Sequence, residues 1–227
     1  MSDAVVCLPS LHALNALPGV TTRFLGRVTG VDVVRERQEA MALLAPYHRQ
    51  LLQREGLDGS PLITAEQVHG NEIAFLESAE ACTTVPIRGV DGLATSQQGI
   101  TLGIYIADCA PVWIVAKNGS AGALLHSGKK GTELDITTRG ITLLCERAHL
   151  TPDKLIVAIG PCIRPPCYEV DFAAAIRAQA ASSGVSEVHD DLVCTACHSD
   201  LYYSYRREGG LTGRMLATLT LQPLRPS

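Results

Sequence analysis

Apolar runs separated by short polar breaks dominate the middle of the chain. Three of them, residues 101–107, 111–116 and 121–125, are rich in Ile, Val or Leu and are bounded by Gly, Asp or Asn. Short continuous apolar runs with such boundaries are typical of buried strands. The turn at 117–120 predicts that the second and third strands pair antiparallel. The start of the second strand and the end of the third are then expected at the same edge of the pair.

The rest of the chain mixes helical and strand patterns. Apolar residues at helical spacing predict three helices, at 33–56, 133–150 and 171–183. Pro46 is expected to kink or split the first of these helices. Short apolar runs predict further strands at 19–26, 61–64, 73–76, 90–95 and 155–159, and a last apolar segment at 212–221.

The chain shows no repeat, no low-complexity tract and no linker, whereas residues 185–200 have a mixed pattern. Helices and strands are interspersed, and the strands are hairpin-like rather than strictly alternating with helices. The pattern therefore predicts one domain over residues 1–227, of the α/β (α+β) class.

Composition narrows the function classes. The chain has 227 residues, of which 46% are hydrophobic and 19% charged, enough for a sizeable core. Its net charge of −4, from 19 basic and 23 acidic residues, argues against nucleic acid or an anionic membrane as the main partner. No apolar run approaches the roughly 20 residues of a membrane span, and the N-terminus has no signal-peptide pattern. We expect a cytoplasmic protein whose eight cysteines are mostly reduced thiols.

A thiol and an imidazole are predicted at the shared edge of the hairpin. Cys109 precedes one strand and His126 ends the other, while His69 lies between two other predicted strands. One interpretation is a zinc site in which a thiolate and two imidazoles leave a fourth position for water or substrate. The other is a cysteine hydrolase, with Cys109 as nucleophile, His126 as base, and Asp108 or another carboxylate orienting the imidazole. The spacing alone leaves both interpretations open.

A second cysteine motif, Cys194-Thr195-Ala196-Cys197-His198, fits the C-x-x-C-H spacing of covalent haem attachment. That chemistry requires an exported protein, and the sequence shows no export signal. A redox C-x-x-C site lacks a thioredoxin-like context here, and a single C-x-x-C pair is a weak signal for structural zinc. We therefore expect ordinary buried or half-exposed thiols at this motif.

Basic residues form the last candidate set, because several of them neighbour glycines as phosphate-binding turns do. The sequence contains no Walker or G-x-G-x-x-G fingerprint, and a solvated surface is the default interpretation for most of these residues. The set comprises Arg23, Lys129, Lys130, Arg164, Arg206 and Arg207.

Several short motifs follow one another along the chain. They are QVHG at 67–70, VDGLAT at 90–95, ADCAP at 107–111, HSGKKGT at 126–132, GPCIRPPCYEV at 160–170, YRR at 205–207 and TGRM at 212–215. Their order resembles that of the YfiH-type proteins, also called the laccase-domain or multicopper polyphenol oxidoreductase family. The family is also named for purine nucleoside phosphorylase activity and for peptidoglycan editing. The resemblance spans nearly the whole chain, from Thr22 to Met215.

The resemblance implies a layered α/β/β/α fold and a zinc ion held by His69, Cys109 and His126. It implies phosphorolysis of adenosine, inosine and methylthioadenosine to a free base and a ribose 1-phosphate, with adenosine deamination as a second activity. The expected partners are a small-molecule nucleoside and phosphate. The oxidase name implies copper, but one cysteine and two histidines are too few ligands for a multicopper cluster. The likeness of the fold to Cys–His hydrolases leaves hydrolysis of an amide or a cell-wall precursor as the alternative.

On the nucleoside hypothesis, Cys109, His126 and Asp108 are the catalytic candidates. A second group, Arg23, Lys130 and Glu169, comprises the candidates for substrate binding: the cations would position phosphate, and either Asp108 or Glu169 would shuttle protons.

Two motifs depart from the family pattern. The family has His-Ala-Gly-Trp-Arg-Gly where this chain has residues 126–131, so an aromatic residue is lost and Lys130 replaces Arg. The positive charge survives, but the planar fork that binds phosphate or carboxylate through two bonds does not. In the proline-rich loop, Arg164 replaces Gly and Pro166 replaces the first of two Cys. These changes concern the substrate more than the metal.

Overall fold

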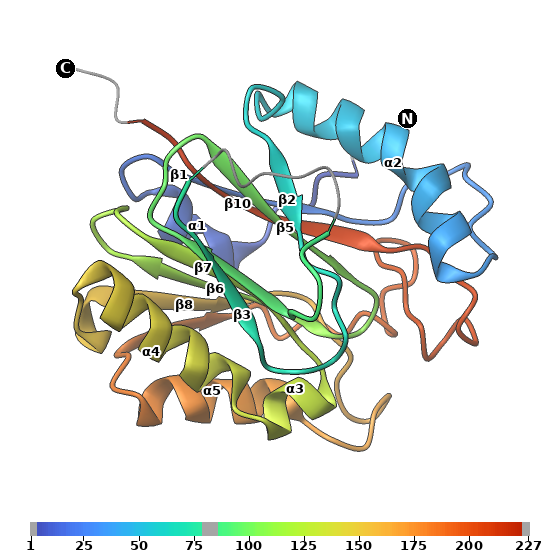
Figure 1. Ribbon diagram of the computed structural model, residues 1–227. Coiled ribbons are helices and arrows are strands. Elements are labelled where there is room, and N and C mark those ends of the chain that lie inside the picture. Colours follow the sequence, from blue (N-terminus) through green and yellow to red (C-terminus); the bar gives the residue numbers. More distant parts are fainter. Residues whose placement is uncertain (1–3, 79–85, 224–227) are drawn as a thin grey trace.

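Two mixed β-sheets form the centre of the molecule in the computed structural model, which describes residues 4–78 and 86–223 (Figure 1). The four-stranded sheet runs in the order β1 (Val20–Leu25), β10 (Met215–Leu221), β5 (Ile100–Ile106) and β2 (Leu62–Thr64). The six-stranded sheet runs in the order β3 (Ile73–Leu76), β4 (Gly92–Thr95), β7 (Gly122–Ser127), β6 (Ala110–Ala116), β8 (Leu155–Ile159) and β9 (Glu187–Asp190). The pairs β2–β5, β3–β4 and β8–β9 are parallel, and the other pairs are antiparallel.

Helices cover the outer face of each sheet. The long helix α2 (Arg37–Arg54) lies over the four-stranded sheet, where its Leu51 and Leu52 belong to the same buried cluster as Leu25 and Leu216. On the other side of the molecule, the six-stranded sheet is covered by α3 (Lys129–Glu133), α4 (Ile136–Ala148) and α5 (Phe172–Ser182) (Figure 1).

Three shorter elements complete the described chain. A 3₁₀ turn (Pro9–Leu11) leads into α1 (His12–Asn15), which packs against β1. A second 3₁₀ turn (Pro152–Lys154) leads into β8. In the part of the chain that the structure describes, no helix is both long and apolar enough to span a bilayer.

The main core lies between the two sheets. It joins Phe24, Leu102 and Leu219 of the four-stranded sheet to Trp113 and Leu124 of the six-stranded sheet, and all five side chains are fully buried. The indole N–H of Trp113 donates to the carbonyl of Thr218, 2.9 Å away, so this buried polar group is satisfied across the sheet interface. The layered α/β/β/α fold implied by the resemblance is therefore confirmed.

The predicted hairpin is also confirmed, because β6 and β7 pair antiparallel with Pro111 opposite His126. The preceding strand β5 belongs to the other sheet, although only residues 107–109 separate it from β6. The chain therefore crosses from one sheet to the other at this point. Asp108 adopts a left-handed conformation at the crossing, with φ of 86°. This sharp crossing places Cys109 at the edge of the six-stranded sheet.

The structure corrects three details of the predicted elements. Pro46 does not split α2, which continues to Arg54 although proline cannot donate the usual helical hydrogen bond. Residues 129–133, which largely precede the predicted helix at 133–150, form the separate helix α3, in which the Thr132 N–H donates to the Gly128 carbonyl at 2.9 Å. The mixed region 185–200 contains the strand β9, which the sequence analysis did not assign.

A buried histidine in α2 gives the fold an expected pH dependence. His48 is 2% exposed, its ring lies 5.7 Å from that of Tyr105, and neither ring nitrogen has a hydrogen-bond partner among the described residues. Burial lowers the pKa of His48 from 6.5 to about 4. Between pH 6.5 and about pH 4, His48 is therefore protonated in the unfolded chain but not in the folded chain. The free energy of unfolding falls as the pH falls through this window.

We expect a His48→Phe variant to lose about 2 kcal/mol less unfolding free energy than the parent when the pH falls from 7 to 5. Urea unfolding at the two pH values measures this difference. A matched His12→Phe variant, at an exposed histidine, serves as the control and should follow the parent. Equal losses in the His48→Phe variant and the parent would show that His48 is protonated at the same pH in the folded and unfolded chains.

Candidate functional site

Three side chains from distant segments meet at the edge of the six-stranded sheet. They are His69 from the loop between β2 and β3, Cys109 from the crossing between the sheets, and His126 from β7. One ligand atom from each lies within 4.8 Å of the others. The two imidazole rings are 4.9 Å apart between centroids and inclined at 72°. The structure therefore brings together the set whose convergence the spacing left open.

A buried carboxylate stands behind this cluster. Asp91 is 0% exposed, and its Oδ1 lies 2.8 Å from Nδ1 of His126. The same carboxylate accepts the backbone N–H groups of Val68, His69 and Gly70 at 2.7–3.1 Å. Asp91 therefore fixes both the ring of His126 and the loop that carries His69. A carboxylate bonded to the second nitrogen of a ligand histidine is the usual outer partner of a metal site.

The approach of the chain to the Cys109 sulfur is tight. A Cβ added at Gly128 would lie 2.6 Å from Sγ of Cys109, so only glycine fits at this position. The His69 loop is strained, because Gln67 and His69 both have φ near 60°. The amide of Gln67 anchors the loop by bonding both the N–H and the carbonyl of Tyr105. The backbone thus holds the three ligand atoms in place.

The cluster also shifts the pKa values of its members. Burial alone would raise the pKa of Cys109, but His126 and His69 outweigh it and lower the pKa to about 6. Burial would lower the pKa of His126, but the Cys109 thiolate and the Asp91 carboxylate raise it to about 9. A thiolate is the form of cysteine that binds metals and attacks electrophiles.

The remaining predicted carboxylates are engaged by other groups. Asp108 is buried, and its two oxygens accept from the Thr195 hydroxyl at 2.6 Å and the backbone N–H of Arg206 at 2.7 Å. It does not bond His126; that role belongs to Asp91. The exposed Glu169 accepts from the Arg206 side chain at 3.0 Å, so among the described contacts Arg206 links it to Asp108.

The two predicted substrate-binding cations lie on different elements. The guanidinium of Arg23, in β1, pairs with Glu55 at 2.5 Å and also donates to the carbonyl of Thr22. Neither of these partners belongs to the cluster. Lys130 is exposed on α3, two residues after Gly128. The structure thus places Lys130, rather than Arg23, on a segment that contacts the cluster.

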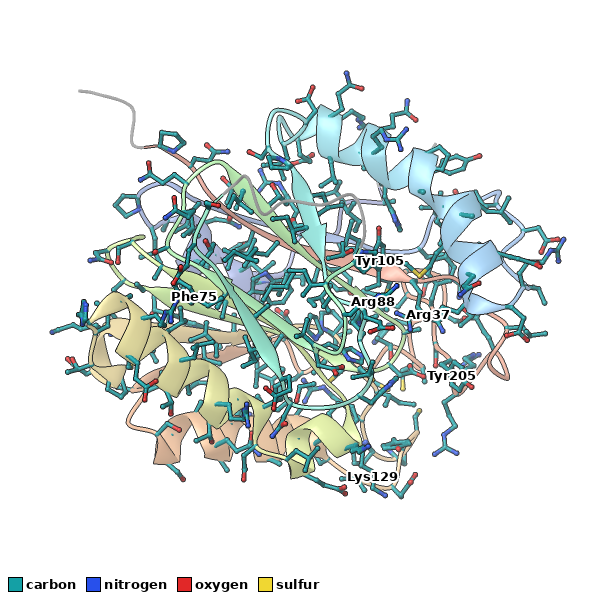
Figure 2. All side chains as sticks on the ribbon, viewed as in Figure 1. Arg37, Phe75, Arg88, Tyr105, Lys129 and Tyr205 are labelled. Carbon is teal, nitrogen blue, oxygen red and sulfur yellow. The ribbon has the colours of Figure 1, made fainter. Side chains whose placement is uncertain are left out.

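Sequence reasoning missed a further cation near the cluster, Arg214, which is 9% exposed. Burial and the charge of Arg37 lower its pKa, whereas the charges of Tyr205, Cys109 and Asp108 oppose this shift. Arg214 therefore lies within electrostatic reach of both Arg37 and the cluster. Figure 2 shows Arg37 and Tyr205 at the right of the view and Lys129 at its lower edge. The position of Arg214 in the TGRM motif at 212–215 was the sequence signal that could have identified it.

Arg164, which replaces a family glycine, is not a free surface cation. Its guanidinium forms an ion pair with Asp190, and its Nε donates to the carbonyl of Val193 at 3.3 Å. Both partners of the ion pair are largely buried. This departure from the family pattern therefore adds a buried contact between the proline-rich loop and the end of β9.

Comparisons with known proteins find a matching family model and named relatives. The family model described as "Multi-copper polyphenol oxidoreductase laccase" matches residues 29–173 and 170–222. The protein named purine nucleoside phosphorylase YlmD from Geobacillus stearothermophilus is 33% identical over 194 residues, covering 68% of this chain and 70% of that protein. A protein named adenosine deaminase RL5, from an unknown prokaryotic organism, is 26% identical and covers 70% of this chain and 74% of that protein.

Solved structures share the fold. The crystal structure of YlmD from Geobacillus stearothermophilus superposes with a TM-score of 0.86 at 24% identity, over 98% of each chain. Neisseria meningitidis protein NMB0706 gives a TM-score of 0.81 at 19% identity, over 97% of this chain and 100% of that chain. On the match to the family model and the identity to YlmD, the chain belongs to the laccase-domain family of YfiH-type proteins that its motifs indicated.

Proposed function

We propose that the chain is a zinc-dependent purine nucleoside phosphorylase that acts on adenosine, inosine and methylthioadenosine and also deaminates adenosine. In phosphorolysis the bond from C1′ to the purine nitrogen breaks, a bond from C1′ to a phosphate oxygen forms, and the base leaves with the electron pair and takes a proton. The observation that carries the proposal is the cluster of His69, Cys109 and His126 with Asp91 behind it. The names of the relatives support the same reaction class.

The donor set fits zinc. Two imidazole nitrogens and one thiolate sulfur, close enough to share one ion, are ligands that Zn²⁺ prefers, and three protein ligands leave one position for a reactant. Asp91 supplies the outer carboxylate. Zinc bound there supplies Lewis-acid catalysis. A multicopper centre needs more ligands than this cluster offers, so copper is the weaker assignment.

The residues around the cluster suit an anionic co-substrate. We assign phosphate binding to Arg214, a largely buried cation that makes no ion pair among the described residues and donates only to the carbonyls of Thr212 and Gly213. Lys130 of α3 is a second cation for this role, whereas the ion pair of Arg23 with Glu55 makes Arg23 a weaker candidate. The exposed ring of Tyr205, 5.8 Å from the Arg214 guanidinium, offers a face for the purine.

The carboxylates of Asp108 and Glu169 have different roles in this proposal. Asp108 already accepts two hydrogen bonds, so we assign it a positioning role for the chain next to Cys109. Glu169 is exposed and has only Arg206 as a side-chain partner among the described contacts, which leaves it the better candidate to contact substrate or move a proton.

Product analysis after incubation with adenosine and phosphate tests the proposal. We expect zinc-loaded protein to release adenine with ribose 1-phosphate, together with inosine from deamination. Omitting phosphate should abolish adenine formation and leave inosine formation intact. Unchanged adenosine from protein with full zinc occupancy would overturn the proposal.

One observation favours a second candidate function. Cys109, His126 and Asp91 form a thiolate, imidazole and carboxylate arranged as in cysteine hydrolases, which suits attack on an amide such as one in a cell-wall precursor. The two candidates differ in their inhibitors. A hydrolase is inactivated by iodoacetamide and is indifferent to chelators, whereas the zinc phosphorylase loses activity when a chelator removes the metal.

A further inference from the structure

A second group of three sulfur atoms lies outside the candidate active site. Cys167 belongs to the proline-rich loop after β8, and Cys194 and Cys197 belong to the turn after β9. Their sulfur atoms all lie within 4.8 Å of one another, and those of Cys167 and Cys197 are 3.4 Å apart. Cys194 is buried, Cys167 is half-buried and Cys197 is exposed. Cys167 therefore adds a third sulfur to the C-x-x-C pair of Cys194 and Cys197.

The spacing of these sulfurs suits a shared metal ion. A tetrahedral ion with Zn–S bonds of about 2.3 Å holds its sulfur ligands about 3.8 Å apart. The three thiols already approach that separation without an ion. In addition, the buried Cys194 thiol donates to the carbonyl of Arg164 at 3.8 Å, which holds this sulfur against the proline-rich loop that carries Cys167.

The fourth nearby cysteine does not join the group. Cys162 is fully buried, and burial raises the pKa of its thiol, so this side chain stays a neutral core residue. No carboxylate or imidazole of the described residues completes the group either, which leaves an exposed fourth position beside Cys197.

We propose that Cys167, Cys194 and Cys197 bind a structural Zn²⁺ ion through three thiolates, with the fourth position open to water or a small solvent ligand. Three thiolates and one exchangeable ligand match the soft-donor preference of this ion. The site is separate from His69, Cys109 and His126 and does not depend on the proposed phosphorylase activity.

The proposed ion would join two loops that hold the active-site crossing. Thr195, between the paired cysteines, donates to Asp108 at 2.6 Å. On the proline-rich loop, the Tyr168 ring packs 4.8 Å from the guanidinium of Arg206, and the backbone N–H of Arg206 donates to the Asp108 carboxylate at 2.7 Å. Zinc at the thiols would therefore fix both loops that position Asp108, one residue from Cys109.

Cobalt binding in a background without the first cluster tests the proposal. A Cys109→Ala variant removes the only sulfur ligand of that cluster. We expect this variant, reduced and titrated anaerobically with Co²⁺, to bind about one equivalent and to show sulfur-to-cobalt charge-transfer absorption. Zn²⁺ should displace the Co²⁺ and abolish the band. Adding Cys197→Ser, a substitution at an exposed position, should weaken Co²⁺ binding at least about tenfold.

A matched Cys109→Ala/Cys7→Ser variant, which also loses one exposed thiol, should keep the absorption. Circular dichroism of each variant establishes that it is folded. The proposal is wrong if the reduced Cys109→Ala variant shows no charge-transfer band, or if Cys197→Ser leaves the band unchanged. It is also wrong if the protein purified anaerobically with reductant contains a disulfide among these cysteines and no second metal.

Discussion

Replacing Cys109 with alanine is expected to remove the metal from the first cluster and to lower phosphorolysis and deamination together by more than about a hundredfold. Loss of an outer partner of a metal site costs about 10- to 100-fold in affinity or activity, and loss of a direct ligand should cost more. Cys109 supplies the only sulfur of the cluster, so two imidazoles would remain. Metal analysis of the purified variant and product analysis with adenosine and phosphate measure the two effects.

A matched Cys145→Ala variant separates this effect from the general loss of a thiol. Cys145 is partly buried on α4 and belongs to neither sulfur-containing cluster. Its replacement should leave metal content and both activities within about twofold of the parent, because the effect would be confined to packing on that helix. Full occupancy of the first cluster in Cys109→Ala would contradict the ligand assignment. Loss of the metal from Cys109→Ala with unchanged activity would contradict the assignment of this cluster as the catalytic site.

The sequence predicted most strands and helices correctly, but it did not predict which sheet each strand belongs to. Continuous apolar runs identified β5, β6 and β7, because each strand is buried on both faces between a helix layer and the other sheet. The pattern did not reveal that β5 and β6 belong to different sheets, since a three-residue connection also suits neighbouring strands of one sheet. It also missed β9, whose four residues are all half-buried and pair in parallel with β8. That strand depends on a distant partner rather than on its own pattern.

The candidate site was predictable at its ligands and not at its supporting groups. His69, Cys109 and His126 stand out because imidazole and thiol at strand ends are chemically distinctive. Asp91 does not stand out, because an Asp-Gly pair before a strand is also an ordinary turn signal. Its role depends on the contact with His126, which comes from pairing between β4 and β7. In the same way, only the fold shows that Cys167 reaches Cys194 and Cys197.

Replacing Asp91 with asparagine is expected to cause the second-largest loss of zinc affinity and activity at the site, after the loss of Cys109. Asparagine has nearly the same shape, but it loses the negative charge that faces Nδ1 of His126 and one of the two oxygens that accept the loop amides. We expect zinc affinity to fall about 10- to 100-fold, with activity recovering in part when zinc is added in excess. Competition with a chromophoric chelator measures the affinity, and the zinc dependence of the initial rate measures the recovery.

Asp108→Asn is the informative comparison, because it changes a carboxylate of similar burial that bonds Thr195 and Arg206 instead of a ligand histidine. Because Asp108 positions the backbone beside Cys109 and does not contact a ligand ring, this variant should lose less zinc affinity than Asp91→Asn does. Equal losses of zinc affinity in both variants would mean that Asp91 acts through general packing rather than through His126. Retained affinity in Asp91→Asn would show that the imidazole is oriented by the backbone alone, since the charge at Nδ1 would then contribute nothing to the metal.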